Sequence, residues 1–137
     1  MTEFPIVTAF AAGLSGLLIV LLALRVVFLR RRYRIGIGAD GAPELNRAVR
    51  VHGNALENLP ISLILLLIAE LSGVLSTTLL AVIAAVIVIA RLLHAWGLSH
   101  SEGASNGRFI GTLANWLAIL LLSGMLMGIA LFQVING

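Results

Sequence analysis

Long apolar runs alternate with short polar segments along the whole chain. Each run is near the length of about 20 apolar residues that a helix needs to cross a bilayer. The runs predict helices over about 5–29, 44–73, 75–97 and 108–134. The alternating strand-length segments of a membrane β-barrel are not found, and the short connections favour antiparallel neighbours. We therefore predict an all-α membrane protein, a four-transmembrane-helix antiparallel bundle, with residues 1–137 in one domain.

The composition supports residence in a membrane. Of the 137 residues, 60% are hydrophobic and 11% are charged, and the mean hydropathy is +1.09, whereas a soluble domain is roughly 45–50% apolar and about 25% charged. The chain contains no Cys, which excludes disulfides, thiolate nucleophiles of its own and Cys-based metal sites. Nothing in the sequence arranges the histidines as metal ligands, so we predict no metal site.

The positions of the arginines predict the orientation. The chain contains arginines but no lysine. The loop after the first run holds Arg30, Arg31, Arg32 and Arg34, and Arg108 ends the loop before the fourth run. By the positive-inside rule, both basic loops face the cytoplasm. The many Ala, Leu and Arg residues without Lys favour a bacterial host, and hence its inner (plasma) membrane. Because the cluster lies between membrane spans, we expect contact with anionic membrane lipids and no nucleic acid.

A polar stripe interrupts the second predicted helix. At about 100° per residue, Arg47, Arg50, Asn54, Glu57 and Asn58 fall within roughly a third of the circumference. A charge at bilayer depth costs on the order of 2.5–3.5 kcal/mol, so such groups normally pair with one another or face a wet cavity. The stripe could line a site for a partly anionic polar ligand, since guanidinium groups fork onto carboxylates. The alternative is a buried network that joins helices without any ligand.

Further polar and small residues lie on the third and fourth predicted helices. Arg91 and His94 share a face at spacing i,i+3, and Arg108 opens the fourth helix. Taken alone, these residues are typical of interfacial anchoring and topology signals. Gly124 and Gly128 form a G-x-x-x-G pair, a spacing that permits close approach between membrane helices.

The second predicted helix carries a recognisable motif. The run Arg50-x-x-x-Asn54-x-x-Glu57-x-x-Pro60 resembles the membrane-associated proteins in eicosanoid and glutathione metabolism, the MAPEG family. Microsomal glutathione transferases and the leukotriene- and prostaglandin-forming synthases belong to this family. The basic segment 29–36 is similar to the stretch after the family's first helix.

The resemblance covers nearly the whole chain, including the number of helices and the loop lengths. Arg91-x-x-His94 resembles the end of the family's third helix, and Arg108 falls where an arginine starts the fourth. Among the members of the family, the chain is most similar to the small bacterial proteins.

The resemblance implies a homotrimer that binds glutathione, its co-substrate, between adjacent subunits near the cytoplasmic face. In the leukotriene-forming relatives, an arginine after the first helix is proposed to activate the thiol, and Arg31 matches it. An adjacent guanidinium favours the thiolate, which is the nucleophile. Lipophilic electrophiles would arrive through the bilayer. The implied glutathione contacts are Arg50, Asn54, Glu57, Arg91, His94 and Arg108.

Two positions depart from the family pattern. Leu98 stands where many family enzymes carry a tyrosine, and Gly53 where some eicosanoid enzymes carry a second arginine. We expect a membrane-bound glutathione transferase or peroxidase that acts in detoxification of lipophilic electrophiles. One alternative is a MAPEG-fold membrane protein without catalysis. Another is a small multidrug-type exporter of lipophilic cations, which would use Glu57, although the neighbouring arginines repel cations.

Overall fold

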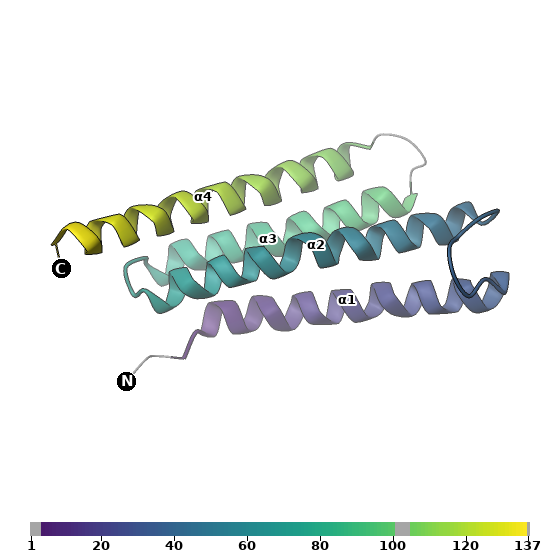
Figure 1. The fold of residues 1–137 in the computed structure, drawn as a ribbon, viewed down its shortest axis with the longest axis horizontal. Coiled ribbons are helices and arrows are strands. Elements are labelled where there is room, and N and C mark those ends of the chain that lie inside the picture. Colours follow the sequence, from purple (N-terminus) through teal and green to yellow (C-terminus); the bar gives the residue numbers. More distant parts are fainter. Residues whose placement is uncertain (1–3, 101–104, 137) are drawn as a thin grey trace.

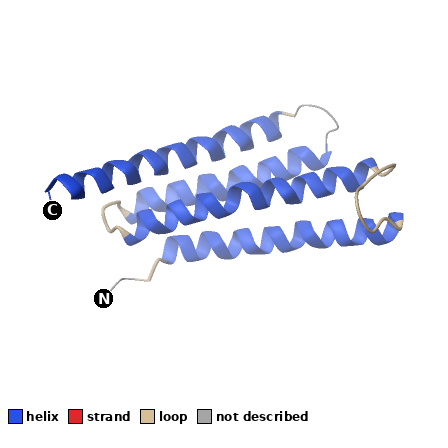
Figure 2. Cartoon of the chain, in the orientation of Figure 1, coloured by secondary structure: helices blue, strands red, loops and turns tan. Residues whose placement is uncertain are grey.

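Four long helices make up the part of the chain that the structure, a computed structural model, describes. That part comprises residues 4–100 and 105–136, and it contains no strand (Figures 1 and 2). Each helix is long and apolar enough to cross a membrane, so the predicted all-α four-helix membrane fold is confirmed. The helices are α1 (Ile6–Tyr33), α2 (Pro43–Leu71), α3 (Thr77–His100) and α4 (Asn106–Asn136).

The two middle helices of the sequence also form the middle of the bundle. Helix α1 packs against α2 and α3, and α4 packs against α3 and α2, whereas the described parts of α1 and α4 do not meet. Successive helices run antiparallel, as predicted (Figure 1). The α1–α2 loop, the C-terminal end of α3 and the N-terminal end of α4 therefore share one end of the bundle. We call this the basic end, because Arg31, Arg50 and Arg108 lie there.

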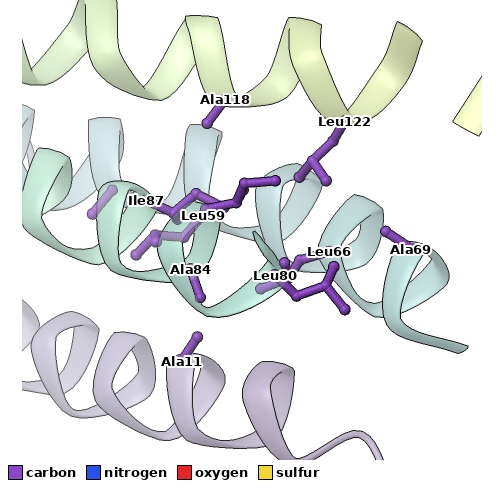
Figure 3. Close-up of a cluster of buried hydrophobic side chains, with 11 residues drawn as sticks. Ala11, Leu59, Leu66, Ala69, Leu80, Ala84, Ile87, Ala118 and Leu122 are labelled. Atoms are coloured by element: carbon purple, nitrogen blue, oxygen red, sulfur yellow. The ribbon is translucent and has the colours of Figure 1, made fainter. Parts of the chain in front are cut away.

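The core combines a few large side chains with many small ones. Leu59, Leu66, Ile87 and Leu122 are fully buried where the helices meet, next to small residues such as Ala84 (Figure 3). Lipid tails are as apolar as leucine, so close packing rather than escape from water holds membrane helices together. Small core residues allow that packing, and most of the large apolar side chains point outward instead.

Helix α1 continues four residues past its predicted end, through the arginine cluster to Tyr33. Cations in the last turn interact favourably with the negative end of the helix dipole, which explains the extension. The helix ends where Arg34 adopts a left-handed conformation with φ of 55°. The N–H of Ile35 donates to the Arg30 carbonyl at 3.1 Å, and that of Arg34 to the Arg31 carbonyl at 3.3 Å, as in a Schellman motif.

The other end of α1 is capped by a side chain from α2. Pro5 at the N-cap supplies no side-chain hydrogen bond. Instead, the Glu70 carboxylate accepts two: Oε1 from the Val7 N–H at 2.9 Å and Oε2 from the Thr8 N–H at 2.8 Å. These N–H groups have no partner inside the helix, and the carboxylate also faces the positive end of the helix dipole. Glu70 thus joins α1 to α2 at the end opposite the basic end.

Replacing Glu70 with alanine is expected to loosen the start of α1. The loss of an N-cap acceptor typically costs about 1 kcal/mol, so the thermal midpoint in detergent should fall and hydrogen exchange at residues 7 and 8 should speed up. Glu70→Gln keeps one acceptor oxygen and serves as the matched control with a smaller effect. Unchanged exchange at these amides in Glu70→Ala would contradict the capping role.

Candidate functional site

Three glycines bring α3 and α4 into close contact at the basic end. A Cβ atom added to Gly111 would lie 2.5 Å from the Ala90 carbonyl oxygen, and one added to Gly97 would lie 2.8 Å from the Arg108 backbone nitrogen. Gly107 is nearly as crowded. Since real side chains do not tolerate such distances, only glycine allows this approach. The contact fixes the polar ends of the two helices against each other.

The glycine pair singled out in the sequence is not the one that this contact uses. A Cβ atom at Gly124 or Gly128 would meet no atom of the chain within 4 Å. The pair in close contact is Gly107-x-x-x-Gly111, which has the same spacing. The sequence pattern could have indicated it equally well, but spacing alone does not say which face of a helix meets a neighbour.

Most of the predicted site residues line one open cleft at the basic end. We call it the polar cleft; its volume is about 360 Å³. Arg50 and Glu57 are exposed in this cleft, and in the described part of the chain neither makes a hydrogen bond or an ion pair. These two charges of the stripe therefore do not neutralise each other in the described part of the chain. The lining residues are Val49, Arg50, Gly53, Asn54, Glu57, His94, Leu98 and Arg108.

Arg91 lies behind the polar cleft rather than in it. Its side chain is only 2% exposed; Nη1 donates to Asn54 Oδ1 and Nη2 to the Gly111 carbonyl oxygen, both at 2.9 Å. A guanidinium can only donate hydrogen bonds, so Arg91 takes the oxygen of the Asn54 amide. The Nδ2 donors of Asn54 are left for the cleft, because they make no hydrogen bond with the described residues.

Farther along α2, the polar side chains bond to carbonyls of their own helix and reach α4 at one contact. Asn58 Nδ2 donates to the Asn54 carbonyl oxygen at 2.9 Å, and Ser62 Oγ donates to the Asn58 carbonyl at 2.9 Å. Ser62 Oγ also lies 3.4 Å from Oδ1 of the fully buried Asn115 on α4. The stripe therefore lines an open cleft near the basic end and also contacts other helices, α3 through Asn54 and α4 next to Ser62.

A second open cleft adjoins the first. We call it the apolar cleft; its volume is about 560 Å³. Asn54, His94 and Arg108 line both clefts, so the clefts adjoin at these three residues, which we call the shared wall. Beyond this wall, the apolar cleft is bounded by Phe109, Leu113 and Trp116 of α4, together with the polar Ser105 and Thr112. Its lining residues are Asn54, His94, Ser105, Arg108, Phe109, Thr112, Leu113 and Trp116.

The remaining predicted residue, Arg31, lines neither cleft. It is exposed near the end of α1, a helix that does not touch α4 in the described part of the chain. Leu98 and Gly53, the two departures from the family pattern, do line the polar cleft. Within residues 4–99 and 105–136, no three His, Asp or Glu side chains gather to hold a metal ion.

Comparison with known proteins identifies the family. The model of the MAPEG family matches residues 8–128. The chain belongs to the MAPEG family. This MAPEG protein is 38% identical over 116 residues to the inner membrane protein YecN of Escherichia coli strain K12, a match that covers 85% of this chain and 86% of YecN. YecN of Escherichia coli O6:H1 matches to the same extent.

The relatives and the four spans agree on where this MAPEG protein resides. Four candidate membrane spans make it a multi-pass membrane protein. Its similarity to an inner membrane protein over most of both chains supports a location in an inner membrane. The matched residues, 8–128, include both clefts and every predicted site residue.

Proposed function

We propose that this MAPEG protein binds glutathione in the polar cleft and transfers it to lipophilic electrophiles held in the apolar cleft. The observation that carries the proposal is the shared wall of Asn54, His94 and Arg108 between the two clefts. The thiol of glutathione in the polar cleft and an apolar substrate in the apolar cleft would come into contact next to these three residues. Phe109 and Trp116 of the apolar cleft are exposed, so in a membrane its substrates would enter from lipid.

The charges of the polar cleft suit the charges of glutathione. Glutathione carries two carboxylates, one ammonium group and a thiol. Arg50 and Arg108 offer guanidinium donors to the carboxylates, and Glu57 offers a carboxylate to the ammonium group. Asn54 adds an amide donor that needs an acceptor, because Arg91 has taken its oxygen. The ligand would thus supply the countercharges that Arg50 and Glu57 lack within the protomer.

The proposed reaction begins with the thiolate form of glutathione. Its sulfur attacks the electrophilic carbon, a C–S bond forms, and the leaving group departs with the electron pair of the broken bond. An adjacent guanidinium favours the thiolate, and we assign this role to Arg31. Because Arg31 lines neither cleft of its own chain, it would act in a homotrimer, at the cleft of an adjacent subunit. With a lipid hydroperoxide, two glutathione molecules would be oxidised to the disulfide, giving the alcohol and water.

The proposed orientation puts the basic end on the cytoplasmic side. The arginines of the α1–α2 loop and Arg108 flank the membrane spans at this end, and the positive-inside rule places such loops in the cytoplasm. Both clefts would then open near the compartment that supplies glutathione.

Calorimetry of the detergent-solubilised protein tests the binding step. Glutathione should bind the wild type, and Arg50→Ala and Glu57→Gln should each weaken binding at least tenfold, since a hydrogen bond to a charged group contributes about 1.5–3 kcal/mol. Arg32→Ala is the matched control. Arg32 Nη1 lies 3.8 Å from Glu44 Oε2, and this arginine lines neither cleft. The control should bind glutathione as the wild type does.

Conjugation of 1-chloro-2,4-dinitrobenzene tests the chemical step. The expected result is chloride release above the uncatalysed rate. Leu98 in the polar cleft favours a second candidate, a MAPEG-fold protein that binds glutathione without turnover, and binding with no conjugation or peroxide reduction would support it. If glutathione gives no heat and a quaternary cation does, both candidates fail and the exporter interpretation stands.

A further inference from the structure

The loop between α1 and α2, residues 34–42, is held in shape by one arginine side chain. Arg30 Nη1 donates to the carbonyl oxygens of Gly36 and Gly38, each at 3.0 Å, and to that of Ile35 at 3.4 Å. These carbonyls flank Ile37, whose side chain is 96% exposed. The loop is therefore fixed around an apolar side chain that it presents outward.

The residue that ends α1 adds a second unusual feature. Arg34 has a left-handed backbone with φ of 55°, at the helix-ending position that glycine normally occupies. A side chain disfavours this conformation, so its presence here points to a use for the guanidinium. Arg34 is exposed, and within the described residues its side chain makes no hydrogen bond or ion pair. By contrast, Arg30 holds the loop and Arg32 lies near Glu44.

The length of α1, together with the arginines of its last turn, favours a position of this loop at the level of the lipid headgroups. Its 28 residues span about 42 Å, against a hydrocarbon thickness of about 30 Å. The last turn of α1 therefore extends beyond the hydrocarbon into the region that holds lipid phosphates. The segment 30–44 carries four arginines against two carboxylates, Asp40 and Glu44, so it keeps a positive charge there.

We infer that the loop is a binding site for an anionic phospholipid. The Arg34 guanidinium donates to the headgroup phosphate, and Ile37 inserts beside it at the boundary between headgroups and acyl chains. A guanidinium alone would bind any phosphate, but the exposed Ile37 gains only from an apolar surrounding, which a lipid supplies and a soluble anion does not. The inference concerns the rim of the bundle and does not rest on glutathione binding.

Native mass spectrometry of the full-length protein in a neutral detergent tests this site, with dioleoyl-phosphatidylglycerol as the probe. Arg34→Gly should weaken phosphatidylglycerol binding about fivefold, the usual effect of one basic residue near an anionic surface. The same substitution should raise the thermal midpoint without lipid, because glycine adopts the left-handed conformation freely. Weaker phosphatidylglycerol binding together with a higher thermal midpoint would show that the site is lost while the fold is kept.

A second pair of variants tests the apolar contact. Ile37→Ser should also weaken phosphatidylglycerol binding, whereas Val74→Ser, in the uncharged turn at the other end of the bundle, should not. Phosphatidylcholine should bind more weakly than phosphatidylglycerol, and inorganic phosphate should not compete at matched concentration. Wild-type phosphatidylglycerol binding by Arg34→Gly would overturn the site. Equal binding of inorganic phosphate would overturn the lipid as its ligand.

Discussion

Asn54→Asp is expected to weaken glutathione binding more than Asn54→Ala does. The Arg91 guanidinium holds the amide oxygen of Asn54 at 2.9 Å, so the wild-type side chain offers the cleft only N–H donors. Alanine removes this donor, and we expect about tenfold weaker binding. Aspartate keeps the bond to Arg91 but turns a carboxylate oxygen toward an anionic ligand. The added repulsion should weaken binding by at least a further tenfold.

The order of the two variants should be reversed for stability: Asn54→Ala should be less stable than Asn54→Asp. This reversal separates an effect on glutathione binding from an effect on the fold. Asn54→Ala leaves a buried guanidinium donor without an acceptor, a loss of about 1–3 kcal/mol, whereas Asn54→Asp retains the partner of Arg91. Thermal unfolding in detergent and glutathione calorimetry on the same samples would show both orders. Binding by Asn54→Asp that equals or exceeds binding by Asn54→Ala would mean that the ligand meets an acceptor, and that the amide orientation is wrong.

Gly111→Ala should destabilise the bundle, whereas Gly124→Ala should stabilise it. At Gly111 the new methyl group would lie 2.5 Å from a carbonyl oxygen of α3, and overpacking of this kind typically costs about 1–3 kcal/mol or more. At Gly124 it would meet nothing within 4 Å. Alanine there should gain up to about 1 kcal/mol in helix propensity. Both positions lie on α4, so the pair is matched for residue type and helix.

The Gly111 substitution should also reduce glutathione binding. Displacing α4 moves Arg108 away from the shared wall and removes the Gly111 carbonyl from Arg91 Nη2. Thermal midpoints and calorimetry of the two variants would measure both effects. An equal loss of stability at Gly124 would show that its open face is covered in the intact protein, and would contradict the packing difference described here.

The helices and the α2 stripe could be predicted because their signals lie along one helix. Apolar runs of membrane-spanning length are visible in the sequence alone, and the angular positions of Arg50, Asn54 and Glu57 follow from helix geometry. The structure places these three residues in one cleft with His94 and Arg108. The family resemblance added the residues of α3 and α4, which no periodicity joins to α2.

The roles of Arg91 and Glu70 could not be predicted, because their partners, which include backbone groups, lie on other helices. The position of Arg91 near the end of α3 is typical of an interfacial anchor, and the resemblance implies a glutathione contact. In the structure it binds a carbonyl 20 residues away on α4. Glu70 binds N–H groups more than 60 residues away. Such contacts depend on how each helix is rotated against its neighbour, and the periodicity of a single helix does not reveal that rotation.

The open space beside Gly53 has an evolutionary consequence. A Cβ atom at this position would touch nothing within 4 Å, and both Gly53 and Leu98 face the same cleft. A larger side chain can therefore enter the cleft at position 53 without displacing a neighbouring helix, whereas Leu98 is buried in a cluster with Val51 and Ala95. If the protein is the transferase proposed above, a side chain added at position 53 would face the bound glutathione. The bundle would then serve as a scaffold for laboratory evolution of catalysis.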